Sequence, residues 1–243
     1  MKAIILSAGR GSRLLPLTET KPKCLLEVSG KSVLRHQLSA LDKAGLDHAT
    51  VVTGFLPDLV EEDIGKWDGR MSVSTLFNPF FQVADNLASC WMARETMEGG
   101  FLLLNGDTLV SQPIVDRVVA ADDWSVSVTV DRKEDYDADD MKVTLDGERL
   151  MAIGKRLPPE QTNAESIGFL KFDADGAALF RHTVEEMLRT QEGISAWFLK
   201  AIDALAKSGE TIGTCSIEGM SWSELDTLED WNRIKKISAD LIE

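Results

Sequence analysis

The sequence predicts an α/β protein with a doubly wound, mostly parallel (Rossmann-like) mixed sheet and a C-terminal substrate lobe. Up to about residue 130, short apolar runs alternate with amphipathic helical segments, the order that builds such a sheet. A loop with two glycines follows the first apolar run, where doubly wound sheets bind their ligands. Beyond residue 130 a hairpin pattern interrupts the alternation, and this change predicts a different second half.

Strands and helices alternate through the first half. Residues 3–7 (AIILS) form an uninterrupted apolar run, as expected for a strand buried on both faces. Ser32 can accept a hydrogen bond from the first turn of a helix over 33–44, and Gly45 ends that helix. The elements that follow are strand 49–53, helix 57–66, strand 72–77, a helix from 85 or 86 to 97, strand 101–105, helix 113–121 and strand 124–130.

The second half begins with an acidic segment, 131–140, which could face a cation but which we interpret as a solvated loop. Asp146-Gly147-Glu148 is a typical hairpin turn between two short strands. The predicted elements are strands 141–145, 149–154 and 166–172, helices 177–189 and 195–208, strand 211–216 and helix 228–239. No linker or repeat divides the chain, so we predict one domain over 1–243 with two halves, 1–130 and 131–243.

Composition and charge exclude several kinds of partner. The net charge of −14 argues against binding to nucleic acid, which requires a basic surface. No apolar run approaches the roughly 20 residues of a membrane helix, so we expect no membrane partner. Three scattered cysteines without a CxxC pair fit a cytoplasmic protein with reduced thiols. Oligomeric state is not indicated.

The loop after the first strand is the basic part of an acidic chain. Residues 1–31 contain six lysines and arginines against two glutamates, which indicates a local anion site. Gly9 and Gly11 allow backbone N–H groups to approach an anion closely, and Arg13 and Lys23 add positive charge. The Walker A pattern is absent, and Leu14 occupies the third glycine position of GxGxxG, so a nicotinamide site is disfavoured.

Residues 7–28, SAGRGSRLLPLTETKPKCLLEV, closely resemble the signature of the nucleoside triphosphate transferase family, which includes sugar-1-phosphate nucleotidyltransferases. The resemblance implies a GT-A-like nucleotidyltransferase fold, with a nucleotide-binding half (1–130) and an acceptor-binding half (131–243). It also implies that Arg13 and Lys23 contact the triphosphate and assist the departing pyrophosphate. The residues expected along the nucleotide are Leu6, Ala8, Gly9 and Gly11.

Two acidic residues are candidate ligands of Mg²⁺. Asp107 follows the apolar strand 101–105, and a carboxylate at that end of a strand projects into the ligand crevice. The segment 222–227, WSELDT, resembles a family segment whose Asp completes the metal site, which implies Asp226. Glu224 points the same way as Asp226 if this segment is extended, so it is a reserve ligand or an acceptor contact.

The segment 78–91, NPFFQVADNLASCW, resembles that of phosphocholine and 2-aminoethylphosphonate cytidylyltransferases. We therefore expect Asn86 and Ser89 to contact the nucleotide. Lys155 is a candidate for the acceptor phosphate, and Glu165 and Trp197 are candidates for the rest of the acceptor.

The chemistry predicted is attack by a phosphate or phosphonate oxygen on the α-phosphorus of a nucleoside triphosphate, with release of pyrophosphate. The nucleophile is already anionic near neutral pH, so catalysis must mainly offset repulsion between the anions and charge on the leaving group. Positioning, Mg²⁺ and cationic side chains can do this. We expect CTP and a small phosphorylated acceptor. Two alternatives stay open, namely a sugar-1-phosphate nucleotidyltransferase and a nucleotide sensor without catalysis.

Overall fold

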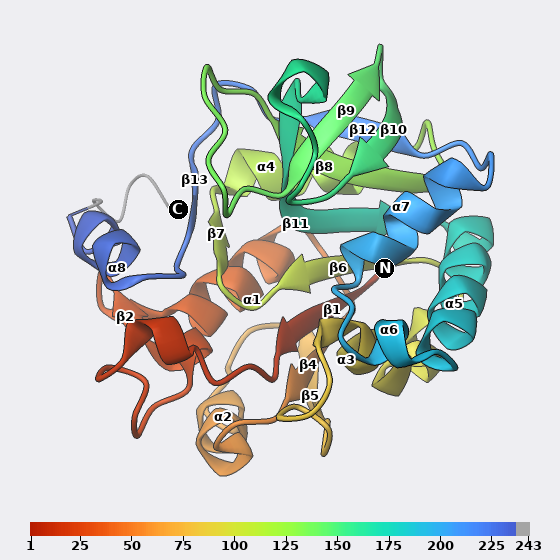
Figure 1. The fold of residues 1–243 in the computed structure, drawn as a ribbon. Helices are drawn as coiled ribbons and strands as arrows, with labels where there is room; N and C mark the ends of the chain where they lie inside the picture. Colours follow the sequence, from red (N-terminus) through yellow and green to blue (C-terminus); the bar gives the residue numbers. More distant parts are fainter. Residues whose placement is uncertain (237–243) are drawn as a thin grey trace.

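A nine-stranded mixed sheet runs through the computed structural model, which describes residues 1–236 (Figure 1). Its strands are β1 (Lys2–Ser7), β4 (His48–Thr53), β5 (Ser72–Phe77), β6 (Phe101–Asn105), β8 (Val126–Asp131), β9 (Lys142–Asp146), β10 (Arg149–Ile153), β11 (Ala164–Phe172) and β12 (Gly213–Ser216). They lie in the order β5-β4-β1-β6-β11-β8-β12-β10-β9. Short strands β2 (Glu27–Val28) and β3 (Lys31–Ser32) form one separate pair, and β7 (Thr108–Val110) and β13 (Trp222–Glu224) form another.

Strands β5, β4, β1 and β6 are parallel, in the order expected of a doubly wound sheet. The helices are α1 (Val33–Lys43), α2 (Pro57–Ile64), α3 (Asn86–Met92), α4 (Gln112–Ala120), α5 (Ala174–Leu188), α6 (Gln191–Ile194), α7 (Leu199–Lys207) and α8 (Leu228–Ile234). The predicted cap of α1 is present, because the Ser32 hydroxyl accepts from the Arg35 N–H at 3.1 Å. None of the described helices has the length and apolar character needed to cross a membrane.

Strand β11 joins the two halves of the sheet. Its last residues pair antiparallel with β6, whereas Ala164 and Glu165 pair with β9. An irregularity between Ser166 and Leu170 separates the two regions. The strands β8, β12, β10 and β9 therefore curve back onto β11, and the parallel order of the first half does not continue into the second.

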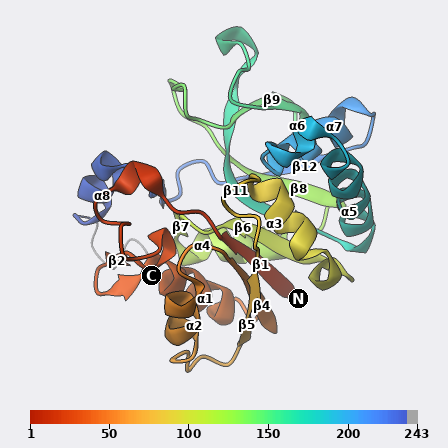
Figure 2. The ribbon, with the colours of Figure 1, turned by 60° about the horizontal axis from the view of Figure 1, so that its bottom comes forward.

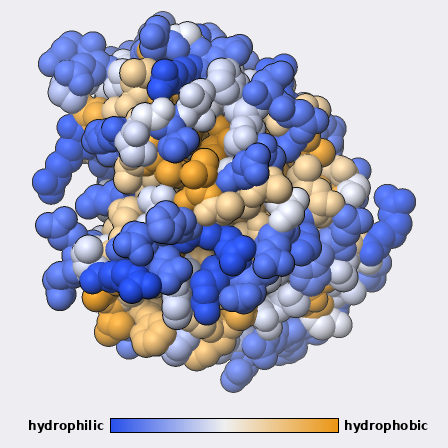
Figure 3. All heavy atoms as spheres, turned by 90° about the vertical axis from the view of Figure 1, so that its right-hand side faces the viewer, coloured by the Kyte–Doolittle hydropathy of each residue, from blue (hydrophilic) through white to orange (hydrophobic). Residues whose placement is uncertain are grey.

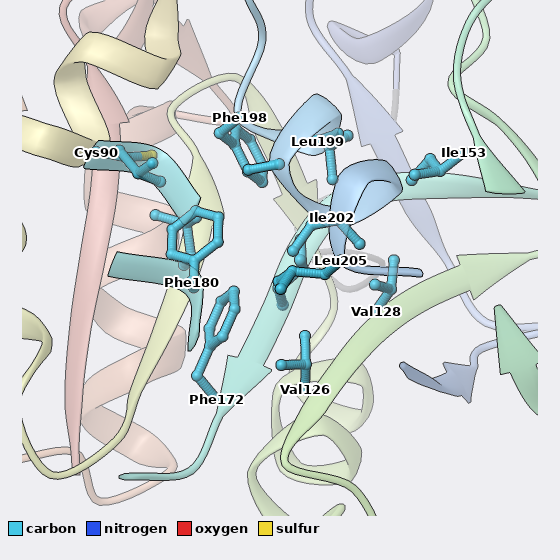
Figure 4. Close-up of a cluster of buried hydrophobic side chains, with 14 of the residues drawn as sticks. Cys90, Val126, Val128, Ile153, Phe172, Phe180, Phe198, Leu199, Ile202 and Leu205 are labelled. Atoms are coloured by element: carbon cyan, nitrogen blue, oxygen red, sulfur yellow. The ribbon is translucent and has the colours of Figure 1, made fainter. Parts of the chain in front are cut away.

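Consecutive side chains of β1 pack into two hydrophobic cores on opposite faces of the sheet, as expected for a strand buried on both faces. Ile4 packs with α3, α5 and α7, and Ile5 packs with α1, α2 and α4. Figure 4 shows the first core, where Phe172 and Phe180 lie beside the side chains of α7, with ring centroids 4.8 Å apart. On the face that carries α5 and α7, hydrophobic atoms form patches separated by hydrophilic side chains (Figure 3).

Tertiary contacts changed several predicted elements. The helix predicted over 195–208 begins at Leu199, because the preceding residues pair with α3 instead: the Phe198 N–H donates to Asn86 Oδ1 and the Leu87 N–H to the Ala196 carbonyl. The helix predicted to reach 97 ends at Met92 and continues as a 3₁₀ turn. The predicted C-terminal helix ends at Ile234, and its last predicted residues, 237–239, lie outside the described part.

The last described segment returns to the first half of the chain. Figures 1 and 2 place α8 beside β2 and the loop after β1. Leu225 and Ile234 are fully buried against Leu14 and Leu109 in a small core of their own. This segment, which belongs to the predicted second half, therefore packs on residues of the first half.

Candidate active site

A cleft of about 1320 Å³ lies at the carboxyl ends of β1 and β6. The chain order in the sheet reverses between these strands, and doubly wound sheets bind ligands at such a point. Every residue that the sequence analysis assigned to the site lines this cleft. They are Leu6, Ala8, Gly9, Gly11, Arg13, Lys23, Asn86, Ser89, Asp107, Lys155, Glu165, Trp197, Glu224 and Asp226.

The loop after β1 is held from beneath by buried side chains. Gly11 has φ +67°, a left-handed conformation that favours glycine, and its carbonyl accepts a 2.7 Å hydrogen bond from the hydroxyl of buried Thr18. Leu14 is fully buried. A Cβ on Gly9 would meet no atom within 4 Å, so the backbone there faces open space. This loop can present its backbone to an anion.

Asp107 lies near that loop because the chain leaving β6 runs in close contact with the end of β1. The Gly106 N–H donates to the Leu6 carbonyl at 3.0 Å. A Cβ on Gly106 would lie 2.4 Å from the Ser7 Oγ, so only glycine fits between β1 and the chain that leaves β6. The glycine before Asp107 therefore sets how near this carboxylate comes to the loop.

The pairing of β13 with β7 brings two more carboxylates to Asp107. Glu224 lies opposite Thr108 in this pair, and the Leu225 N–H donates to the Asp107 carbonyl at 3.0 Å. Carboxylate oxygens of Asp107, Glu224 and Asp226 all lie within 4.8 Å of one another. All three residues are predicted from the sequence as candidate ligands, and the structure joins them in one cluster.

Two basic side chains of the loop contact the cluster. The Lys23 Nζ lies 2.6 Å from Asp107 Oδ2 and 2.5 Å from Asp226 Oδ1. Arg13 Nη2 lies 2.7 Å from Asp226 Oδ2. Burial lowers the pKa of Lys23, but the charges of Asp107 and Asp226 outweigh it and raise that pKa overall. Lys23 is therefore a cation.

The three carboxyl groups differ in their electrostatics. Burial, followed by the charges of Asp107 and Asp226, raises the pKa of Glu224 to about 8. Burial also acts to raise the pKa of Asp226, but Lys23 and Arg13 outweigh it and lower this pKa overall. Without a further cation, Glu224 therefore holds a proton near neutral pH while Asp226 is ionised.

The cluster suits a small divalent cation. Asp107 Oδ1 is buried and has no hydrogen-bond partner, and coordination of a metal ion would satisfy this oxygen. Mg²⁺ prefers oxygen ligands and is commonly held by one or two carboxylates together with phosphate oxygens. Asp107, Asp226 and Glu224 provide such a donor set beside an anion-binding loop.

Lys155 and Trp197 meet in the same cleft. The Lys155 Nζ lies 5.0 Å from the centroid of the Trp197 ring, within the range of a cation–π contact. It also lies 3.6 Å from Asp139 Oδ1. The indole face predicted to contact the acceptor is thus in contact with Lys155.

Glu165 is paired with a lysine that the sequence analysis did not select. The Lys133 Nζ lies 3.0 Å from Glu165 Oε2 and 2.7 Å from Asp140 Oδ2. Burial raises the pKa of Glu165 to about 7, although the charge of Lys133 acts in the opposite direction. The only sequence signal for Lys133 is its place at the start of an acidic segment.

That acidic segment is a loop, as expected, but it is not only a solvated one. Asp131, Asp137, Asp139 and Asp140 line the cleft. The loop is tied down by buried Lys142, whose ammonium donates to the Asp137 and Lys155 carbonyls. The hydrophobic periodicity of the sequence could not reveal that this loop lines the cleft, because periodicity describes the segment itself and not its tertiary contacts.

Asn86 and Ser89 line the cleft but also have structural partners. The Asn86 Oδ1 accepts from the Phe198 N–H at 2.8 Å, and the buried Ser89 Oγ accepts from the Asn78 side chain at 3.0 Å. Both bonds hold α3 in position. Their predicted contact with the nucleotide stays a prediction.

Residues 2–140 match the sequence model of a family described as nucleotidyl transferase. The chain is 24% identical to a CTP:phosphoglutamine cytidylyltransferase of Campylobacter jejuni, over 95% of this chain and 97% of the relative. It is 28% identical to a UTP–glucose-1-phosphate uridylyltransferase of Haloferax volcanii, over 90% and 89%. The solved structure of CTP:phosphocholine cytidylyltransferase from Streptococcus pneumoniae has the same fold, with a TM-score of 0.81, 22% identity and 97% of each chain covered.

Proposed function

Because the chain belongs to the nucleotidyl transferase family, and is thus a transferase of nucleotidyl groups, we propose that it is an Mg²⁺-dependent cytidylyltransferase. In this proposal it joins the CMP of CTP to a small phosphorylated or phosphonylated acceptor, such as phosphocholine or 2-aminoethylphosphonate, and releases pyrophosphate. The observation that carries the proposal is the contact of Lys23 and Arg13 with the carboxylates of Asp107 and Asp226 inside the cleft.

The proposed step forms a bond between an acceptor oxygen and the α-phosphorus and breaks the bond to pyrophosphate. The acceptor oxygen is already anionic, so the protein must mainly offset negative charge and align the two reactants. Arg13 and Lys23 would take up charge on the triphosphate and on the leaving pyrophosphate. Asp107 and Asp226, with Glu224 as a third ligand, would hold Mg²⁺, whose charge offsets that of the phosphates.

The remaining roles follow from position in the cleft. Leu6, Ala8, Gly9 and Gly11 lie on and after β1 and would border the base, ribose and phosphates. Lys155, whose ammonium contacts the Trp197 ring, would approach the acceptor phosphate. Asn86 and Ser89 would border the nucleotide, and Glu165 and Trp197 the acceptor.

Two features support CTP with an amine-bearing acceptor. Proteins named as cytidylyltransferases match along almost the whole chain, one in sequence and one in fold. The cleft wall is also rich in carboxylates outside the proposed metal site, because Asp85, Asp137, Asp139 and Asp140 line it, with Asp139 in contact with Lys155 and Asp140 with Lys133. Such a wall favours an acceptor that carries a positive group.

A sugar 1-phosphate is the second candidate acceptor. It is favoured by the similarity to the uridylyltransferase of Haloferax volcanii, which spans nearly the full length of both chains. That reaction would use the same loop and carboxylates, so only the acceptor side distinguishes the two candidates.

Pyrophosphate release should be measured with each nucleoside triphosphate against a panel of acceptors. The panel is phosphocholine, phosphoethanolamine, 2-aminoethylphosphonate, inositol phosphate and hexose 1-phosphates. We expect release with CTP and an amine-bearing acceptor. Turnover with hexose 1-phosphates alone would replace the proposal by its alternative, and triphosphate binding without any turnover would indicate a sensor.

A further inference from the structure

The Lys23 ammonium lies between two carboxylates of the cluster. It lies within hydrogen-bond distance of one oxygen of Asp107 and one of Asp226. The other Asp226 oxygen accepts from Arg13 at 2.7 Å. Both oxygens of Asp226 are therefore engaged by side chains of the loop after β1.

This arrangement conflicts with a divalent cation on the same oxygens. Mg²⁺ requires ligand oxygens at about 2.0–2.1 Å, and its charge repels an ammonium held on the same two carboxylates. The Lys23 side chain is only 13% exposed, so water screens that repulsion weakly. The metal and the ammonium cannot occupy this position together.

We propose that Lys23 is an internal counter-ion, which holds the Asp107 and Asp226 carboxylates until a nucleoside triphosphate draws its ammonium away. Divalent metal and triphosphate then bind cooperatively, and metal alone binds weakly. This inference rests on the proposed function, because it assigns Lys23 to the triphosphate once the metal is bound.

The position of Lys23 permits such a change of partner. Its Cα belongs to the 3₁₀ turn Lys23–Leu25, which buries Cys24 and Leu25 and keeps the backbone in place. The flexible four-carbon side chain can redirect the ammonium without moving that turn. Its stem passes beside Gly11, where a Cβ would lie 3.0 Å from Lys23 Cβ, so the absence of a side chain at Gly11 leaves room for the stem next to the loop.

The coupling must be reciprocal. If the triphosphate raises the affinity for metal by removing the ammonium, the metal raises the affinity for triphosphate by the same factor. Removal of the ammonium by mutation should remove much of this coupling and should strengthen the binding of metal alone. A Lys23 that acted only on the triphosphate would leave the binding of metal alone unchanged.

The test measures Mn²⁺ binding to the full chain by electron paramagnetic resonance of the free ion, without nucleotide. We expect Lys23→Gln to bind Mn²⁺ at least 10-fold more tightly than the wild type. Lys21→Gln is the matched control, because Lys21 lies in the same loop and its partner is Glu27, at 2.9 Å, away from the cluster. Equal or weaker binding by folded Lys23→Gln would overturn the proposal.

A second measurement uses the wild type, so the outcome does not depend on the folding of a variant. Mn²⁺ binding is compared with and without a CTP analogue that has a methylene group between its α- and β-phosphates, after correction for Mn²⁺ bound to free analogue. We expect the analogue to tighten Mn²⁺ binding at least 10-fold. No tightening would contradict the proposal.

The two proposals fail in different ways. If Lys23→Gln binds Mn²⁺ more tightly but no acceptor releases pyrophosphate, the counter-ion role stands and the proposed reaction falls. If CTP turns over but Lys23→Gln gains no affinity for Mn²⁺, the reaction stands and the counter-ion role falls.

Discussion

The indole N–H of Trp222 donates a 2.7 Å hydrogen bond to Asp131 Oδ2. This bond joins β13 to the end of β8 across 91 residues of sequence. On its other side, β13 pairs with β7, with Trp222 opposite Val110. Trp222 therefore anchors the short strand that presents Glu224 and, just beyond it, Asp226.

Trp222→Phe should loosen the carboxylate cluster while it keeps an aromatic ring in place. A hydrogen bond to a charged group contributes about 1.5–3 kcal/mol, so we expect a lower melting temperature. We also expect the Mg²⁺ concentration for half-maximal turnover to rise about 10-fold, because a misplacement of Glu224 and Asp226 weakens a metal site. A metal dependence equal to that of the wild type would show that Trp222 only stabilises the fold.

Trp67→Phe is the matched control for this variant. The Trp67 indole donates to the Met71 carbonyl at 2.8 Å, and neither residue lines the cleft. It should lower the melting temperature, by less than Trp222→Phe because its partner is a neutral carbonyl, without a change in metal dependence.

Asp107→Asn tests the metal site directly. The amide keeps the size of the side chain but removes the charge that a divalent cation requires. We expect turnover to fall at least about 100-fold at saturating Mg²⁺, in line with the large share of catalysis that electrostatics supplies at such sites. Asp116→Asn, an exposed position on α4, should retain the wild-type rate. A near-normal rate for Asp107→Asn would remove this residue from the metal site.

Trp197→Leu tests whether the indole positions Lys155. The loss of a cation–π contact of about 0.5–2 kcal/mol should raise the KM for the acceptor about 2- to 30-fold and leave the KM for CTP unchanged. Trp91→Leu is the control, because it removes a similar contact with Arg94, at 4.0 Å, from a residue outside the cleft. Equal effects of both variants on the acceptor KM would contradict a positioning role.

The pH dependence of stability should report on Glu165. Its pKa is raised to about 7 in the folded protein, so between pH 4.5 and 7 the folded state binds more protons at this group than the unfolded state. The contribution of Glu165 to stability is therefore greatest at low pH and declines as the pH rises through this range. Chemical denaturation of Glu165→Gln should show a less negative slope of unfolding free energy against pH there.

Glu160→Gln, which changes an exposed carboxyl group five residues earlier in the chain, should leave that slope unaltered. A Glu165→Gln slope identical to that of the wild type would mean that Glu165 is not the group that titrates.

Local patterns predicted the first half of the fold closely. The strands at 72–77 and 101–105 have the bounds that their apolar runs suggested, and Ser32 caps α1 as expected. In a doubly wound sheet each strand and helix carries its own periodicity and its own end signals, so each can be recognised alone.

Elements that depend on distant partners could not be predicted in the same way. The residues before Leu199 have a helical pattern, but α3 takes their backbone hydrogen bonds, through Asn86 and Leu87. The β7–β13 pair is only three residues long on each side, too short for periodicity to signal. In both cases the preference of the segment is overridden by a partner far away in the chain.

The sequence by itself determined the kind of chemistry: a glycine loop with Arg13 and Lys23, an acid at the end of a strand, and a second acid near the C-terminus. Only the tertiary structure decided that the Lys23 ammonium lies on both Asp107 and Asp226, and that Lys133 and the acidic loop line the same cleft. The reason is physical. A motif fixes the functional groups and their local backbone, whereas the distance between charges remote in sequence depends on the packing of every element between them.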